Sequence, residues 1–108
     1  MANIQTIELR DDLFENVRNC TKIATLRKGV REYALGNTLL YGKKYCDMVT
    51  VKDVIFKKFN EITDNDAKQE GYNKANELKN VMKEFYPDIT EDTICTQVWF
   101  EYNYSFNY

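Results

Sequence analysis

The chain has 108 residues, the length of one domain, and 44% of them are apolar, which is enough for a buried core and too much for a disordered chain. Its apolar runs are far shorter than the roughly 20 residues of a membrane-spanning helix, and the first residues lack the basic and apolar regions of a signal peptide. We therefore expect one cytoplasmic domain over residues 1–108 with no membrane partner, and the net charge of −2 argues against tight, non-specific binding to long nucleic acid.

Hydrophobic periodicity in the first half of the chain predicts one helix followed by strands. Apolar residues at helical spacing predict a short helix over residues 8–18. Gly36-Asn37 marks a turn before the second of the strands. The predicted strands cover residues 21–27, 38–41 and 48–59. In the last of them we expect Val49, Val51 and Ile55 on one face.

The second half predicts two helices and a closing strand. Thr63 with the acids after it is typical of a helix start, and Gly71 can end that helix. Asn73 can cap a second helix, which stops before Pro87. Its apolar stripe, interpreted as core rather than as a partner site, comprises Ala75, Leu78, Val81, Met82 and Phe85. Residues 94–102 alternate with period two and predict a strand, so the fold class is α+β or a small barrel with helical lids.

The chain contains no histidine, and its three cysteines, Cys20, Cys46 and Cys95, are widely spaced. Without histidine, acid–base catalysis depends on lysine, glutamate, aspartate, tyrosine or cysteine. A zinc site on these thiolates would lack a fourth ligand, so we expect no metal, no cofactor and buried free thiols.

The basic residues are unevenly distributed. Residues 1–60 carry 11 basic and 7 acidic residues, whereas residues 61–108 carry 4 and 10. One segment has five basic residues and no acid, namely Arg18, Lys22, Arg27, Lys28 and Arg31. Such a patch can attract phosphate groups, although a solvated basic surface explains it equally well.

Two stretches together resemble the ASCH family. Thr21-Lys22-Ile23-Ala24-Thr25-Leu26-Arg27 is similar to the family's Gly-x-Lys-x-x-Thr-x-Arg element, which precedes a Gly-Asp turn. An acidic helix ending in Glu70-Gly71, a second helix, Tyr86-Pro87 and a strand ending in Phe100 resemble the rest of the family's pattern. The resemblance covers about residues 12–100 and implies a small PUA-like β-barrel with short helices packed at its ends, acting on RNA or nucleosides.

Two positions depart from the family's pattern. Asn19-Cys20 stand where a glycine usually precedes the lysine, and Gly36-Asn37 replaces the Gly-Asp turn. Neither change removes a chemical group that the family uses, but the geometry of the loop around Lys22 depends on that glycine.

The resemblance also implies a catalytic trio. The bacterial N4-acetylcytidine amidohydrolases are family members of similar length, and their proposed catalytic lysine, threonine and glutamate fall on Lys22, Thr25 and Glu70. The competing interpretation is a surface lysine, an ordinary strand threonine and a solvated glutamate paired with Lys74.

Two chemical routes remain open for this trio. A neutral Lys22 can activate the Thr25 hydroxyl while Glu70 shuttles a proton, or Glu70 can activate water while Lys22 stabilises the oxyanion. We expect burial and the nearby cations Arg27 and Lys28 to lower the pKa of Lys22, and the helix dipole to favour protonated Glu70. Residues 22 and 25 of a regular strand point to opposite faces, so their convergence requires a bulge or a loop.

A binding role without catalysis is the alternative. An RNA-binding module would use Arg18, Arg27, Lys28 and Arg31 around a cleft above Glu70. The aromatic tail at residues 102–108 alternates with small polar residues, which suits base stacking, but a strand continuing along the barrel edge or a homo-oligomeric contact explains it as well. We favour the structural explanation of the tail.

Overall fold

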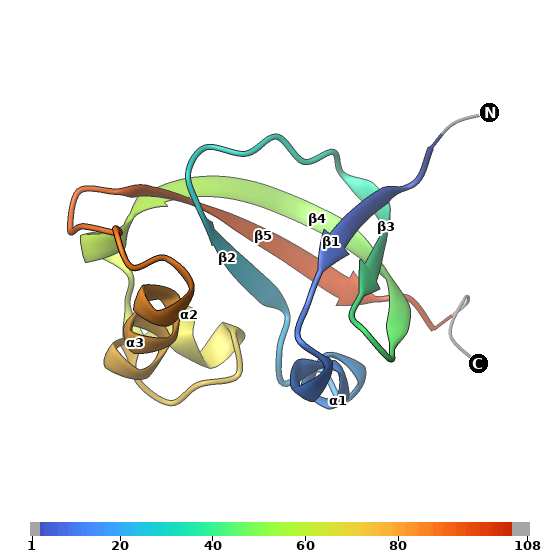
Figure 1. Cartoon of the computed structure of the whole chain (residues 1–108). Coiled ribbons are helices and arrows are strands. Elements are labelled where there is room, and N and C mark those ends of the chain that lie inside the picture. Colours follow the sequence, from blue (N-terminus) through green and yellow to red (C-terminus); the bar gives the residue numbers. More distant parts are fainter. Residues whose placement is uncertain (1–2, 105–108) are drawn as a thin grey trace.

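The computed structural model describes residues 3–104, in which one five-stranded sheet curls into a half-barrel (Figure 1). The strand order is β1-β3-β4-β5-β2, so the long strands β4 and β5 are central and β1 and β2 form the two edges. Only β1 and β3 run parallel, and the other neighbouring strands are antiparallel. The strands are β1 (Gln5–Glu8), β2 (Ala24–Lys28), β3 (Gly36–Tyr41), β4 (Cys46–Lys58) and β5 (Ile94–Tyr102).

The helices pack at the two ends of the curled sheet, which confirms the predicted α+β class (Figure 1). The helix α1 (Phe14–Arg18) follows a single 3-10 turn at Asp11–Leu13, while α2 (Asp64–Gln69) and α3 (Ala75–Phe85) lie between β4 and β5 in the chain. Thr63 caps α2 as expected, because its hydroxyl accepts a hydrogen bond from the backbone N–H of Asp66.

Two predictions about helix boundaries are wrong. The predicted helix over residues 8–18 begins too early, because residues 5–8 form β1 and only the last part of the segment is helical. The parallel partner β3 stabilises this short strand, and a sequence window of four residues gives no sign of that partner. Asn73 does not cap α3, which begins after Lys74 and has no side-chain cap.

A β-bulge in β4 overturns the expected position of Ile55. Val51 lies opposite Phe100, but the register shifts directly afterwards and Val54 lies opposite Val98. The extra residue reverses the alternation of faces, so Val54 rather than Ile55 shares the face of Val51.

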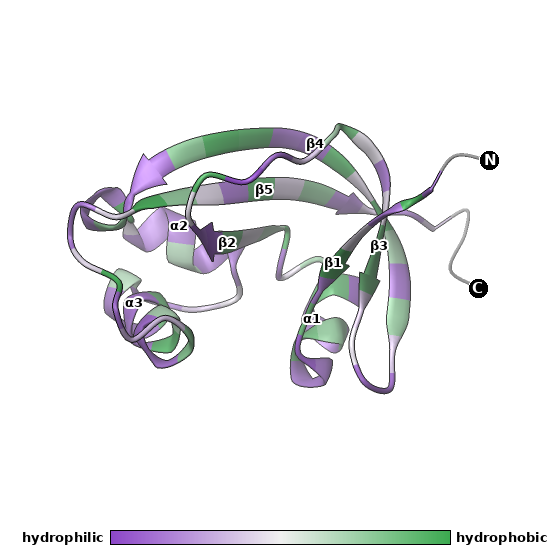
Figure 2. Cartoon of the chain, turned by 45° about the horizontal axis from the view of Figure 1, so that its top comes forward, coloured by the Kyte–Doolittle hydropathy of each residue, from purple (hydrophilic) through white to green (hydrophobic). Residues whose placement is uncertain are grey.

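Two apolar clusters form the core, one at each end of the sheet. Apolar residues occur along β4 and β5, the two strands that run from one end of the sheet to the other (Figure 2). The cluster beneath α1 contains Ile7, Leu9, Phe14, Val17, Leu40, Val49, Val51, Val98 and Phe100. The cluster beneath α2 and α3 contains Leu26, Phe59, Ile62, Ala67, Leu78, Met82, Ile89 and Cys95. The stripe of α3 therefore enters the core as predicted at Leu78 and Met82, whereas Phe85 remains 56% exposed.

The cysteines are free, and only Cys95 is buried, so the expectation of three buried thiols is wrong for Cys20 and Cys46. Cys20 has a φ of +64°, which makes it the one non-glycine residue of the described chain in the left-handed region. This is the position at which the sequence resemblance expects glycine. The loop before Lys22 therefore keeps a glycine-like backbone without a glycine.

We expect Cys20→Gly to be more stable than Cys20→Ala. Both variants lose the contact between Cys20 Sγ and the Tyr104 hydroxyl, at 3.4 Å, but only alanine keeps a Cβ in the left-handed conformation. The difference in the free energy of unfolding should be about 1 kcal/mol, measured by urea denaturation. An alanine variant as stable as the glycine variant would show that the backbone there is unstrained.

Candidate functional site

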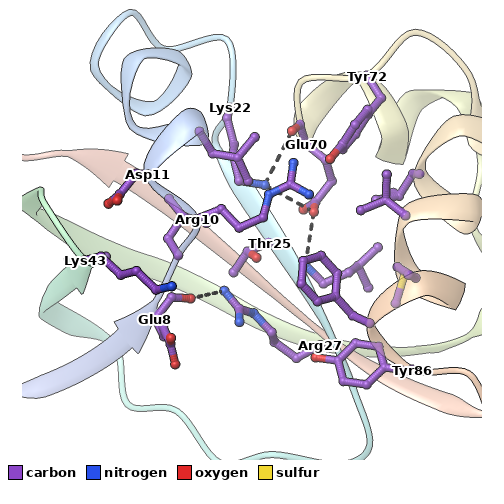
Figure 3. A pocket seen from close by; sticks show the side chains of 18 residues that line it. Glu8, Arg10, Asp11, Lys22, Thr25, Arg27, Lys43, Glu70, Tyr72 and Tyr86 are labelled. Carbon is purple, nitrogen blue, oxygen red and sulfur yellow. Dashed lines mark hydrogen bonds and ion pairs between the residues drawn. The ribbon is translucent and has the colours of Figure 1, made fainter.

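A pocket of about 510 Å³ opens between the two helical ends of the half-barrel, a volume in the range of small-molecule sites (Figure 3). Its apolar wall includes Leu26 of β2 and Leu78 and Met82 of α3. Its polar wall includes, besides Arg10 and Tyr72, the four sequence-predicted residues Lys22, Thr25, Arg27 and Glu70.

Lys22 reaches the pocket from a loop, which removes the geometrical conflict with Thr25. The strand β2 begins only at Ala24, so the alternation of a regular strand does not apply to residue 22. Backbone hydrogen bonds hold the loop, from the Lys22 N–H to the Asn16 carbonyl at 3.0 Å and from the Ile23 N–H to the Gln69 carbonyl at 2.8 Å. The second bond ties the loop to the end of α2, directly before Glu70.

Lys22 and Glu70 form a buried ion pair, with 3.3 Å between Nζ and Oε1 and side chains only 2% and 3% exposed. Lys22 Nζ also donates to the carbonyl oxygens of Ala24 at 2.9 Å and of Glu70 at 3.4 Å. Its three N–H groups thus have three acceptors. Glu70 Oε1 accepts a further hydrogen bond from the backbone N–H of Leu26, at 3.1 Å. The interpretation of Glu70 as a solvated residue paired with Lys74 is therefore wrong, and Lys74 instead lies 4.0 Å from Asp64.

Burial moves the two pKa values of this pair toward each other. Desolvation raises the pKa of Glu70 and lowers the pKa of Lys22, and the attraction between the two charges only partly opposes both shifts. The positive charge of Arg27 lowers both pKa values. The free-energy cost of moving a proton from Lys22 to Glu70 is therefore smaller than it would be between an exposed lysine and an exposed glutamate.

Two buried polar atoms of the pocket have no hydrogen-bond partner within residues 3–104. They are Oε2 of Glu70 and Nε of Arg27. The Arg27 guanidinium is nonetheless held in place, because its Nη2 donates to the backbone carbonyl of Glu8 at 2.5 Å, across the gap between β2 and β1. Because a buried polar group without a partner costs about 1–3 kcal/mol, these two atoms are candidates for hydrogen bonds to water or to a ligand.

Thr25 lies on the same face of β2 as Arg27, because the two residues are separated by one position and stand opposite Val98 and Thr96 of β5. Its side chain is 4% exposed and makes no hydrogen bond to another residue of the described chain. The hydroxyl therefore remains available to a ligand in the pocket.

The other residues of the basic segment lie outside the pocket. Arg18 pairs with Asp47 at 2.5 Å, and Lys28 pairs with Asp88 at 2.6 Å. The Arg31 side chain is exposed and donates to the Lys28 carbonyl at 3.0 Å. The five basic residues thus do not form one surface, since only two of them enter the pocket.

Arg10 is one of several pocket-lining residues, Tyr72 among them, that the sequence does not predict. It lies two residues after the end of β1, and its guanidinium carbon is 5.5 Å from the centre of the Phe85 ring on α3 (Figure 3). It also pairs with Asp12 at 3.1 Å. The sequence offers no signal for this residue, because the spacing of the apolar residues predicts a helix over residues 8–18.

The remaining expectations concern membranes, metals and the aromatic tail. Within residues 3–104 no helix is long and apolar enough to cross a membrane, and no cluster of three potential metal ligands occurs. The strand β5 ends at Tyr102, whose ring meets that of Tyr104 edge-on at 4.7 Å. The rest of the tail, residues 105–108, lies outside the described residues.

Comparison with protein-family models and with the sequences of characterised proteins gave no match, but solved structures are similar. A DUF984-family protein from Enterococcus faecalis aligns with a TM-score of 0.79 and 13% identity over 95% of this chain and 78% of its own. The ASCH domain from Lactobacillus crispatus aligns with a TM-score of 0.76 and 12% identity, over 93% of this chain and 79% of its own. A mutant ASCH protein from Zymomonas mobilis aligns with a TM-score of 0.69 and 9% identity, over 89% of this chain and 66% of its own. The chain therefore has the ASCH fold, in agreement with the resemblance in sequence.

We expect the stability difference between the wild type and Glu70→Gln to depend on pH. Burial raises the pKa of Glu70 above its ordinary value of 4.5, so the folded protein keeps the proton to a higher pH than the unfolded chain. The free energy of unfolding of the wild type should therefore fall relative to the variant as pH rises above 4.5, by at most about 1.4 kcal/mol per pH unit.

Urea denaturation from pH 4.5 to neutrality measures this slope. The matched control is Glu101→Gln, because the Glu101 side chain is 71% exposed and pairs with the exposed Lys52. If the wild type instead gained stability relative to Glu70→Gln as pH rises, the folded state would favour the charged carboxylate, and the prediction would be wrong.

Proposed function

We propose that this protein hydrolyses the acetyl amide of N4-acetylcytidine or of a closely related acylated nucleoside. The supporting observation is the buried Lys22–Glu70 pair, which leaves one carboxylate oxygen unpartnered in a pocket of about 510 Å³ that Thr25 also lines. The similarity of the sequence to the N4-acetylcytidine amidohydrolases supplies the substrate.

Of the two chemical routes, the geometry favours water as the nucleophile. Lys22 Nζ is engaged by three acceptors, and no hydrogen bond within the described chain joins it to Thr25. Glu70 Oε2 is the unoccupied basic atom. It takes a proton from water as the water oxygen bonds to the acetyl carbon, which gives a tetrahedral intermediate.

The same carboxyl group then returns the proton to N4 as the carbon–nitrogen bond breaks, so that cytidine and acetic acid leave and ionised Glu70 is regenerated. The acetic acid then loses its proton to solvent and becomes acetate. Thr25 donates its hydroxyl hydrogen to the acetyl oxygen, where negative charge develops in the intermediate. Lys22 is a positioning residue, since it orients Glu70 and sets its pKa without contacting the substrate.

The first test is acetate release from N4-acetylcytidine. Glu70→Gln should lower kcat by about 10²–10⁴-fold, because glutamine cannot carry the proton, whereas Glu101→Gln should leave the rate unchanged. A wild-type protein that releases no acetate but binds single-stranded RNA in a salt-dependent manner would replace hydrolysis with the binding role. An acetyl group trapped on Thr25 in a quenched reaction, seen by mass spectrometry, would replace water with the covalent route.

The second test separates positioning from catalysis. The charge of Lys22 lowers the pKa of Glu70, so in Lys22→Met that pKa should rise, and the ascending limb of the pH profile of kcat/KM should move to higher pH. Lys52→Met is the matched control, because Lys52 is 59% exposed and its carboxylate partner, Glu101, is exposed as well. A limb that stays in place while kcat falls would show that Lys22 acts on the substrate itself.

RNA binding has less support from the geometry than hydrolysis. Two cations of the basic segment, Arg18 and Lys28, are already paired with carboxylates of other segments. Each of these pairs reduces the net positive charge that phosphate groups would encounter. The pocket is therefore better suited to one nucleoside or one unstacked base than to an extended RNA backbone.

A further inference from the structure

The two unpartnered atoms of the pocket differ in chemical sense. When the carboxyl group is ionised, Oε2 of Glu70 accepts hydrogen bonds and cannot donate one. Nε of Arg27 donates a hydrogen bond and cannot accept one. A ligand that satisfies both must present a donor to Glu70 and an acceptor to Arg27. A simple anion would satisfy Arg27, but it would also bring a second negative charge toward Glu70, whose pKa is already raised by burial.

We propose that Glu70 and Arg27 together read the Watson–Crick edge of a cytosine-type base, which makes Arg27 a specificity-determining residue. This inference rests on the proposed function, in which Glu70 returns a proton to N4 and N4 therefore lies at Oε2. The atoms that follow N4 along the edge of cytosine are N3 and O2, and both are acceptors. Arg27 donates to them from Nε and from a second N–H of its planar guanidinium.

The arrangement of the wall suits this orientation. Thr25 and Arg27 point from the same face of β2, about 6.6 Å apart along a strand, so the acetyl group lies near the former when the base edge lies near the latter. Both side chains and Glu70 face the pocket in Figure 3. Arg27 is also prevented from turning away, because Glu8 holds its Nη2.

The same pattern excludes the other bases. Uracil presents an acceptor at O4 and a donor at N3–H, so the acceptor of Glu70 would face an acceptor and the donor of Arg27 would face a donor. Guanine has the same reversed pattern at O6 and N1–H. Adenine presents a donor and one acceptor but lacks the third polar group. Buried polar groups left unpaired reject a wrong ligand more strongly than missing apolar contacts do. The expected order of affinity is cytosine, then adenine, then uracil and guanine.

The test is the binding of unmodified nucleosides, measured by isothermal titration calorimetry. Cytidine should bind the wild type about 10–100-fold more tightly than uridine. Arg27→Met should lower the affinity for cytidine at least about tenfold and remove most of the discrimination, whereas Lys52→Met should change neither. Glu70→Gln should shift the preference toward uridine, because the glutamine amide can donate to O4.

Three outcomes would overturn the inference: equal affinities for cytidine and uridine, no measurable binding of either, or a ratio unaffected by Glu70→Gln and Arg27→Met. The failure of the proposed function is distinguishable, since binding requires no hydrolysis. Selective binding of cytidine without acetate release contradicts the hydrolytic proposal alone. Acetate release without discrimination between the nucleosides contradicts the reading of the base edge alone.

Discussion

The ion pair between Lys22 and Glu70 joins the loop before β2 to the end of α2, and the rest of the site depends on it. Removing both charges from water is costly, and the two extra carbonyl acceptors of Lys22 offset part of that cost. Removing one partner of such a pair typically destabilises a protein by about 3–5 kcal/mol. The pair fixes one oxygen of Glu70 and leaves the other without a hydrogen-bond partner among the described residues.

Most of the sheet and both later helices followed from the sequence, because their patterns are long enough to show a period. The nine residues of β5 and the stripe of α3 are examples. The strand β1 is not predictable from the sequence, since four residues carry little pattern and the parallel partner lies 33 positions further along the chain. Ile55 was assigned to the wrong face because one inserted residue in β4 reverses the alternation, and periodicity alone does not reveal a bulge.

The candidate site was predictable only through the resemblance to a known motif. Strand alternation would have separated Lys22 from Thr25, and nothing local to Glu70 indicates that its side chain is buried. Arg10 gave no signal because its partner in the site, Phe85, is contributed by a distant helix. Conversely, the basic segment looked more available than it is, since the carboxylate that neutralises Arg18 comes from β4.

The hydrogen bond from Arg27 to the Glu8 carbonyl spans the seam where the two edge strands of the half-barrel approach each other. One side chain thus stands in for the strand pairing that would close a complete barrel. It also occupies a main-chain acceptor that an incoming strand of another molecule would require, so the seam resists sheet extension by a neighbour. The same guanidinium lines the pocket, so one side chain belongs both to the seam and to the pocket wall.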